Sequence, residues 1–369
     1  MKILYVTTVS MTMGFFPEHI KMLLNQGHSV EIATNCEQPL PEVYKTLGCK
    51  SYDIPFSRSP FSKNNVTAYR QLRALVEKEH YDIVHCHTPN AAMVTRLACR
   101  KARKQGTKVF YTAHGFHFFK GAPLKNWLMY YPVEKICARW TDVLITINHE
   151  DYELAQKKMP AKKVCYVPGV GIDLSKIQNV ECDKAEVRKS MGVPEDCILL
   201  LSVGELSTRK NHQVVIKALA KLNNPAVHYA IAGKGALRDR LESLAALLGV
   251  ENQVHFLGQR TDVFKLNKAA DVSVLPSLQE GLPVALMEAM ACGLPVLCSR
   301  IRGNVDLVED GKGGFLFHPL DEVNLAEKLN LVAKECDDLK MLGCVNMQII
   351  KAFGVESALI FMKGIYASI

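Results

Sequence analysis

Short apolar runs alternate with amphipathic stretches along the chain. The apolar runs are rich in Val, Ile and Leu, which is typical of strands buried on both faces of a sheet. In the first half they cover residues 2–8, 29–34, 83–85, 109–112, 143–146 and 164–167. Between them, helical periodicity predicts helices that include residues 17–26, 66–79 and 90–105. Strands separated by helices predict an α/β fold with a doubly wound parallel sheet.

The same pattern starts again in the second half. Strands are expected at residues 197–203, 227–232, 254–257, 272–275 and 295–298. A Pro-Gly-Val-Gly run at residues 168–171 separates the two series and is a natural hinge. We therefore expect two Rossmann-like domains, residues 1–172 and 173–354, and a helix over 355–369 that packs back towards the first domain. Two such domains place a ligand site in the cleft between them.

The composition and charge narrow the class of protein. Hydrophobic residues make up 48% and charged residues 22%, which excludes disordered, collagen-like and coiled-coil chains. No apolar stretch approaches the ~18 residues of a membrane span, and no cleavage signal follows the first apolar run. We therefore expect a cytoplasmic protein, either soluble or attached peripherally to a membrane.

The net charge of +8 is unevenly distributed. Residues 1–172 hold 23 basic and 13 acidic side chains, so the whole excess lies in the first half. Such asymmetry favours an anionic partner for that half. A membrane surface, a nucleic acid and a polyphosphorylated substrate all fit this description.

The 12 cysteines are scattered and include no CxxC pair, which indicates free thiols in a reducing compartment. His85-Cys86-His87 could be a fragment of a metal site. The favoured interpretation is a strand end, because alternation places Cys86 on the opposite face from the two histidines. A zinc site also needs three or four spaced ligands.

The strongest chemical signal is a pair of carboxylates eight residues apart, Glu280 and Glu288. Glu280, Gly281 and Leu282 form a loop after a predicted strand, and Pro283 suits the first position of a helix. The free N–H groups of Gly281 and Leu282 would then lie at a helix N-terminus, which favours anions. This set can hold sugar hydroxyls, a diphosphate and a ribose. A solvated helix start with two surface glutamates is the competing interpretation.

The run EGLPVALMEAMACGLPVL resembles the Glu-x7-Glu motif of the family 4 retaining glycosyltransferases, which have the GT-B fold. The stretches at residues 7–28 and 114–119 resemble the bacterial members that assemble capsular polysaccharide and exopolysaccharide. Further segments resemble the family as a whole, in the same order. These segments are residues 112–115, 202–211, 231–235, 254–258 with Asp262, and 271–277.

The resemblance implies roles for individual residues. Glu280 and the backbone of Gly281 and Leu282 would hold the donor hexose, and Glu288 the ribose hydroxyls. Lys210 would contact the diphosphate and offset charge on the leaving group. Leu257 would present backbone groups to the base, and His114 would stabilise the transition state. The implied catalytic set is therefore His114, Glu280 and Lys210, and a core histidine is the plainer alternative for His114.

The sequence departs from the family pattern in two places. The phosphate loop usually carries an arginine directly after its glycine, and here that residue is Glu205; Arg209, beside Lys210, is the candidate replacement. The paired glycines that often follow the first strand are reduced to Gly14. No Asp-x-Asp pair is present, so a mechanism without metal or other cofactor is expected, with the helix dipole and Lys210 stabilising the diphosphate.

A dense basic cluster precedes an aromatic segment in the first half. Arg96, Arg100, Arg103 and Lys104 share a face at helical spacing, and Phe118 and Phe119 follow in the run HGFHFF. Basic and aromatic residues together favour an interfacial or lipid-linked acceptor. Solvated helix faces with ordinary core aromatics are the alternative, and no motif supports nucleic-acid binding.

The sequence thus predicts a GT-B retaining glycosyltransferase. We expect it to move a hexose or N-acetylhexosamine from a UDP-sugar to a lipid diphosphate-linked glycan, at the inner face of the cell membrane. No base–nucleophile pair is visible near His114, so the acceptor is expected to attack on the face from which the diphosphate leaves. A non-hydrolysing UDP-sugar epimerase and a non-catalytic nucleotide-sugar binding protein remain as alternatives.

Overall fold

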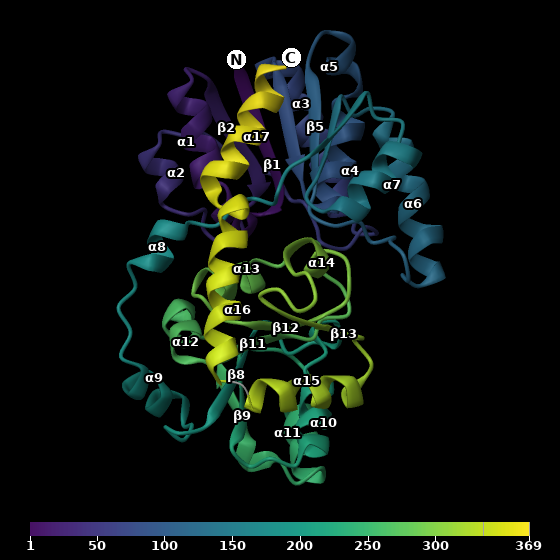
Figure 1. Cartoon of the computed structure of the whole chain (residues 1–369). Coiled ribbons are helices and arrows are strands. Elements are labelled where there is room, and N and C mark those ends of the chain that lie inside the picture. Colours follow the sequence, from purple (N-terminus) through teal and green to yellow (C-terminus); the bar gives the residue numbers. More distant parts are fainter. Residues whose placement is uncertain (335, 369) are drawn as a thin grey trace. The chain divides into compact units, whose positions relative to one another are not determined.

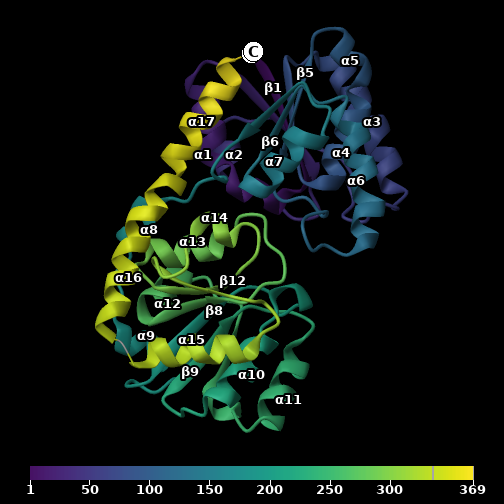
Figure 2. The ribbon, with the colours of Figure 1, turned by 45° about the vertical axis from the view of Figure 1, so that its right-hand side comes forward.

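The computed structural model describes residues 1–334 and 336–368, which form two compact units. Unit 1 comprises Met1–Gly171 and Val355–Ile369, and unit 2 comprises Ile172–Gly354 (Figures 1 and 2). The boundary follows Gly169 and Gly171, which have φ angles of 77° and 79°. Such left-handed angles favour glycine, which explains the composition of the hinge. The boundary lies one residue before the predicted one.

Unit 1 is built on a seven-stranded parallel sheet in the order β3-β2-β1-β4-β5-β6-β7. Its strands are β1 (Lys2–Val9), β2 (Ser29–Asn35), β3 (Ser51–Asp53), β4 (Ile83–His87), β5 (Lys108–Ala113), β6 (Val143–Thr146) and β7 (Lys163–Tyr166). Hydrophobic clusters cover both faces of this sheet, as its continuous apolar strands require.

Helices and short helical turns connect these strands. They are η1 (Ser10–Phe15), α1 (Pro17–Asn25), α2 (Val43–Thr46), α3 (Asn64–Glu79), α4 (Pro89–Ala98), α5 (Arg100–Lys104), α6 (Leu124–Ala138) and α7 (His149–Lys158). The last helix, α17 (Val355–Ala367), lies against α1 in Figure 1. It buries Ala358, Met362 and Ile365 in the same cluster as Ile3 and Tyr5 of β1.

Unit 2 repeats the architecture with a six-stranded parallel sheet in the order β10-β9-β8-β11-β12-β13. Its strands are β8 (Ile198–Val203), β9 (Val227–Ala232), β10 (Val254–Gly258), β11 (Val272–Leu275), β12 (Val296–Ser299) and β13 (Gly314–Phe317). Its helices are α8 (Leu174–Gln178), α9 (Lys184–Met191), η2 (Thr208–Lys210), α10 (Gln213–Leu222), α11 (Arg238–Leu247), η3 (Glu251–Gln253), α12 (Val263–Ala269), α13 (Val284–Ala291), α14 (Asn304–Leu307), α15 (Glu322–Lys334), α16 (Cys336–Ile349) and η4 (Ile350–Phe353). The predicted α/β class with two doubly wound parallel sheets is confirmed.

Three details differ from the sequence prediction. The short edge strands β3 and β13 were not predicted, because the segment SYD of β3 has no apolar run and the segment GFLF of β13 begins at a glycine. The single helix expected over residues 90–105 is two consecutive helices, α4 and α5, that meet at Cys99. Pro283 caps α13 rather than occupying its first turn.

The His85-Cys86-His87 segment is the end of β4, as the favoured interpretation held. Cys86 packs in one core cluster, while the rings of His85 and His87 lie on the other face, tilted by 33° with centroids 4.2 Å apart. His85 is hydrogen-bonded to Thr112 and Tyr366. The 11 cysteines whose side chains are described, all but Cys336, are free thiols.

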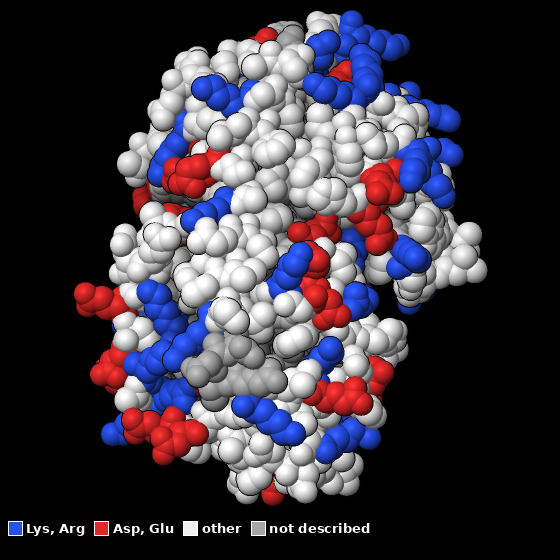
Figure 3. Space-filling view, viewed as in Figure 1, with Lys and Arg blue, Asp and Glu red and all other residues white. Residues whose placement is uncertain are grey.

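Charge is concentrated on part of unit 1. In Figure 3, Lys and Arg side chains gather over α5 and continue down the right-hand edge of that unit. Among the described residues, none of the helices combines the length and the apolar character that crossing a membrane would require.

Candidate functional site

The two carboxylates of the Glu-x7-Glu segment have different environments in unit 2. Glu280 lies in the loop between β11 and α13, and its side chain is 9% exposed. Its Oε1 accepts hydrogen bonds from Lys210 Nζ at 2.8 Å and from Arg209 Nη1 at 3.1 Å. The structure therefore brings together two cations and a carboxylate that lie 70 residues apart in the sequence.

The backbone of the Glu280 loop is held from two sides. Arg209 donates through Nη1 to the Gln279 carbonyl, and the Arg302 Nε donates to the Glu280 carbonyl, both at 3.1 Å. Gly303 lies directly behind the loop with φ at 81°. A Cβ atom on Gly303 would lie 2.3 Å from the Gly281 carbonyl oxygen. Only glycine fits there, so the position of the loop depends on this residue.

Gly303→Ala is therefore expected to displace the Glu280 loop and to lower the melting temperature. The left-handed φ alone costs an alanine about 1 kcal/mol, and the contact with Gly281 adds to this. Gly27→Ala is the matched control, because Gly27 has φ at 78° and open space around it. Thermal unfolding should distinguish the two: an equal loss of melting temperature in both variants would show that the loop does not need Gly303.

The loop after β8 carries the second half of the site. Gly204 leaves room for the Lys210 side chain, since a Cβ there would lie 3.1 Å from Lys210 Cε. Gly233, at the end of β9, packs against this loop so closely that a Cβ would lie 1.8 Å from the Gly204 carbonyl oxygen. The adjacent Glu205 side chain is exposed to solvent. Arg209, by contrast, points at the same carboxylate oxygen as Lys210.

Glu288 lies in the second turn of α13 and is half-buried. Burial raises the pKa of its carboxyl to about 7, against a weaker opposing effect of Lys176. The side chain therefore exchanges its proton close to neutral pH, and it can both donate and accept hydrogen bonds. This matches the needs of a pair of neighbouring hydroxyls.

Glu288→Gln is expected to stabilise the ligand-free protein, and by more as the pH rises. In the unfolded chain the carboxyl ionises near 4.5, whereas in the folded protein it does so near 7. Wild-type stability is therefore lost progressively across this window, and the variant avoids a loss of about 2 kcal/mol. Urea unfolding from pH 5 to pH 8 measures this, with exposed Glu327→Gln as the control. A pH-independent difference between Glu288→Gln and wild type would contradict the assigned burial.

Leu257 lies at an irregularity in the edge strand β10. Phe256 pairs with Ile231 and Gly258 with the next residue, Ala232, so Leu257 is an extra residue in the ladder. Such a bulge leaves one residue outside the regular pairing and bends the strand. The backbone of Leu257 is thereby presented differently from that of its neighbours, which suits contact with a base.

His114 follows β5 in unit 1, at the carboxyl edge of the sheet, where parallel sheets bind ligands. Its Nε2 lies 3.2 Å from Nδ1 of His87. Burial lowers the pKa of His114 to about 4, so the imidazole is neutral at physiological pH. His87 Nε2 is buried without a hydrogen-bond partner among the described residues.

This geometry selects the tautomers of both rings. A buried N–H without an acceptor costs more than a buried lone pair, so the proton of His87 belongs on Nδ1 and is donated to His114 Nε2. His114 then carries its own proton on Nδ1. The neutral His114 ring is thus a hydrogen-bond donor of fixed orientation. His87 is a positioning residue that the sequence analysis missed, although the alternation in His85-Cys86-His87 was the available signal.

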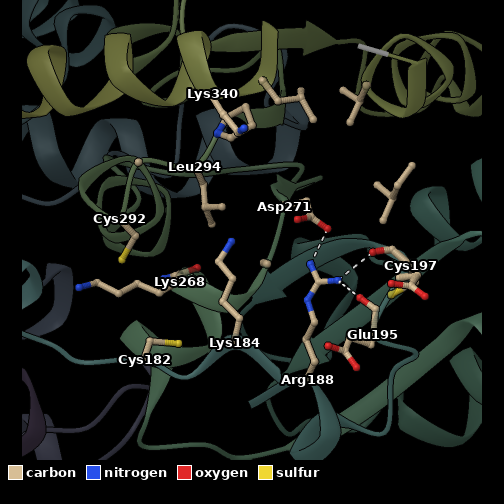
Figure 4. A pocket seen from close by; sticks show the side chains of 18 of the residues that line it. Cys182, Lys184, Arg188, Glu195, Cys197, Lys268, Asp271, Cys292, Leu294 and Lys340 are labelled. Atoms are coloured by element: carbon tan, nitrogen blue, oxygen red, sulfur yellow. Dashed lines mark hydrogen bonds and ion pairs between the residues drawn. The ribbon is translucent and has the colours of Figure 1, made fainter. Parts of the chain in front are cut away.

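A cavity of about 760 Å³ lies elsewhere in unit 2 (Figure 4). It is at the amino ends of β8, β11 and β12, the opposite sheet edge from Glu280. Its Arg188 already donates to Asp271 at 2.7 Å and to the carbonyls of Glu195 and Cys197. We therefore place the candidate site at Glu280 and Lys210 rather than in this cavity.

Comparison with known proteins decides the family. Residues 18–176 match the family described as Glycosyltransferase Family 4, and residues 183–343 match Glycosyl transferases group 1. The chain is 37% identical to EpsD of Bacillus subtilis (strain 168), which is named as a glycosyltransferase; the match covers 100% of this chain and 96% of EpsD.

The chain belongs to glycosyltransferase family 4. It is 28% identical, over 95% of its length and 91% of the relative's, to the UDP-Gal:alpha-D-GlcNAc-diphosphoundecaprenol alpha-1,3-galactosyltransferase of Escherichia coli. The crystal structure of Anabaena HepE in complex with UDP-glucose has a TM-score of 0.84 to this chain at 20% identity, and both chains are covered completely. The predicted GT-B fold and family 4 membership are thus confirmed.

The structure of this family member corrects part of the predicted acceptor surface. Arg96 is 1% exposed, because it pairs with Glu134 at 2.8 Å and stacks on Tyr111. Phe118 is completely buried against Phe116. Neither side chain is available to a membrane or an acceptor at the surface.

The remaining residues of the predicted acceptor surface differ in their exposure to solvent. Arg103 is largely buried and is held by Asp142 in two hydrogen bonds of 2.8 and 2.9 Å. Phe119 is half-buried, while Arg100 and Lys104 are exposed. The expectation of a shared basic face at helical spacing is therefore wrong for Arg96 and Arg103, whose charges are used inside unit 1.

Proposed function

We propose that this glycosyltransferase moves a hexose or N-acetylhexosamine from a UDP-sugar to a lipid diphosphate-linked glycan, with retention of anomeric configuration. The observation that carries the proposal is the convergence of Lys210, Arg209 and Glu280 beside the N-terminus of α13. A cation pair suits a diphosphate, and a partly buried carboxylate suits sugar hydroxyls. The Escherichia coli relative is named for a UDP-galactose donor and HepE was crystallised with UDP-glucose, which supports a UDP-sugar donor.

Each residue has a definite task in this proposal. Lys210 and Arg209 neutralise the charge that develops on the leaving diphosphate, together with the N–H groups of Gly281 and Leu282. Glu280 holds hydroxyls of the transferred sugar. Glu288 holds the ribose, and the backbone of Leu257 contacts the base. These protein groups stabilise the leaving diphosphate and hold the donor. We propose that transfer therefore needs no metal or other cofactor.

The proposed reaction keeps both bonds on one face of the sugar. The bond from the anomeric carbon to the diphosphate oxygen breaks as the bond to the acceptor oxygen forms. The acceptor proton passes to the departing phosphate oxygen, so no enzymic nucleophile is required. The neutral His114 donates a hydrogen bond from Nδ1 and stabilises the transferred group.

His114→Ala is expected to lower kcat by about 10²-fold while changing donor affinity by much less, because its contribution arises in the transition state. Initial rates over a range of donor concentrations separate the two parameters. Since the pKa of His114 is about 4, wild-type kcat should show no histidine titration between pH 6 and 8. A strong rise in KM with unchanged kcat would instead assign His114 to ground-state binding.

The acceptor and the place of action belong to the same proposal. We propose that the enzyme acts in synthesis of cell-surface polysaccharide, as a capsule or exopolysaccharide, on the inner face of the cell membrane. Melting temperatures in a panel of UDP-, GDP- and ADP-sugars test the donor class, because only a ligand of the folded state raises them. Stabilisation by a GDP-sugar alone would overturn the UDP assignment. A new epimer formed from the UDP-sugar without acceptor would favour the epimerase.

A further inference from the structure

A buried chain of polar side chains connects the sheet of unit 2 with the loop after β8. Ser202 Oγ donates to the Val274 carbonyl at 2.5 Å, and Tyr229 Oη lies 2.8 Å from Ser202 Oγ. Tyr229 Oη also lies 2.8 Å from His212 Nδ1, and His212 Nε2 lies 3.2 Å from the Glu205 carbonyl oxygen. Ser202, Tyr229 and His212 are 1%, 0% and 2% exposed, so bulk water does not reach them.

This chain has one proton fewer than it has hydrogen-bonding contacts when His212 is neutral. Four contacts link the five groups, and a carbonyl oxygen, which only accepts, closes each end. Ser202, Tyr229 and a neutral imidazole supply one proton each, so one contact brings two lone pairs together. A second proton on His212 completes all four contacts, because the ring then donates from Nε2 to Glu205 and from Nδ1 to Tyr229. A buried contact without its proton is costly, so the chain favours the imidazolium.

The groups around His212 nevertheless keep its ring neutral in the ligand-free protein. Burial lowers the pKa of His212 to about 4, and Lys210 acts in the same direction, whereas the hydrogen bond to the Glu205 carbonyl opposes them. Arg240 of α11 lines a small cavity of about 90 Å³ together with His212. The Glu205 carboxylate is exposed to solvent, and burial raises the pKa of Tyr229, so its hydroxyl keeps its proton. The charged neighbours are thus mainly cations, and a bound anion reverses their effect on the ring.

In the proposed function this anion is the donor diphosphate, which carries about two negative charges in a UDP-sugar and more in UDP. Lys210 and Arg209 supply two cations, but both also engage Glu280. We propose that His212 takes up a proton from the solvent when the diphosphate binds at Lys210 and Arg209. The imidazolium then adds a buried positive charge and holds the loop through the Glu205 carbonyl, which makes His212 a positioning residue. This inference rests on the proposed function for the identity of the anion.

Calorimetric titration with UDP at pH 7 tests the proton uptake. Runs in buffers of different ionisation enthalpy, such as Pipes and Tris, give the number of protons bound per UDP. His212→Gln is the variant, because its amide can bond to Glu205 and Tyr229 without becoming charged. We expect wild type to take up about one proton more per UDP than His212→Gln. Proton exchange by UDP itself and by Glu288 occurs in both proteins and cancels in the difference.

A second variant and a control accompany this measurement. Tyr229→Phe keeps the volume of the side chain and removes the acceptor of Nδ1, so the extra proton uptake should be lost there too. His80→Asn is the control, since His80 is exposed in unit 1 and asparagine tolerates its left-handed φ of 52°. Nitrogen NMR of histidine-labelled wild type needs no substitution, and one ring should change from imidazole to imidazolium on saturation with UDP.

The pH dependence of UDP affinity has a definite sign. A proton that is taken up on binding weakens the affinity as the pH rises. Between pH 6 and pH 8 the affinity of wild type relative to His212→Gln should therefore fall by up to about ten-fold per pH unit. The kcat at saturating donor should not share this dependence, because the complex keeps the proton.

Two results would overturn the inference alone. One is equal proton uptake in wild type, His212→Gln and Tyr229→Phe while all three bind UDP, and the other is that every histidine ring keeps its charge state on UDP binding. Either result leaves UDP binding, and with it the proposed function, in place. If wild type binds no UDP at all, the proposed function fails and the inference fails with it.

Discussion

Lys210→Ala is expected to lower kcat by about 10³-fold, with a smaller loss of affinity for UDP. Lys210 Nζ is 2.8 Å from Glu280, and its residue is 9% exposed, so its charge acts with little screening by water. A cation in this environment stabilises the leaving diphosphate more in the transition state than in the ground state. Arg209 remains in the variant and should retain part of the proposed diphosphate binding. Steady-state kinetics and UDP titration measure the two effects separately.

Lys221→Ala is the matched control for this substitution. Lys221 is exposed near the end of α10, away from the Glu280 loop, and its removal should leave both parameters unchanged. Lys210→Arg should recover only part of the rate, because a planar guanidinium does not replace a compact ammonium at a close contact. Full activity in Lys210→Ala would contradict the proposal that Lys210 contacts the diphosphate.

Glu280→Gln is expected to separate UDP binding from transfer of the sugar. The amide keeps the size of the side chain but loses the charge that now engages Lys210 and Arg209. Affinity for UDP should therefore be kept or increased, because both cations become free for phosphate. Turnover should fall by about 10²-fold or more, since the transferred sugar loses a charged hydrogen-bond acceptor.

Glu242→Gln provides the control, since Glu242 forms an exposed ion pair with Arg238 on α11. Parallel losses of UDP affinity and turnover in Glu280→Gln would contradict the division of tasks. They would mean that Glu280 chiefly orders the two cations and does not contact the sugar. Calorimetric titration with UDP, which lacks the sugar, distinguishes these cases from activity measurements alone.

Much of the fold is predictable because its elements are long and periodic. Continuous apolar strands such as Ile198–Val203, followed by helical stretches, identify a parallel sheet without further information. The candidate donor-site residues were also predictable in part, because Glu280 and Glu288 flank a helix start at a spacing with direct chemical meaning. The contact between Glu280 and Arg209 was not predictable from the sequence, because the two residues are 71 positions apart.

The predicted acceptor surface shows why charge and aromaticity alone mislead. Arg96 has the same residue type as Arg100, yet Glu134, 38 residues further along, holds it in the core. Phe118 is buried, whereas Leu124 and Leu128, which had not been selected, are exposed. Which face of a short helix points outward depends on packing partners from distant segments, and helical spacing alone does not identify the outward face. Gly303 and Arg302 were missed because their role depends on contacts with the Glu280 loop, about 20 residues earlier in the chain.

Product analysis tests the central claim most directly. The protein is incubated with an α-linked UDP-sugar and a short-chain lipid diphosphate-linked glycan, and the product is examined by mass spectrometry and proton NMR. We predict release of UDP, a product heavier by one sugar residue, and an α-linkage in that product. A β-linkage, free sugar without transfer, or an epimerised donor without any change in the acceptor would contradict the account.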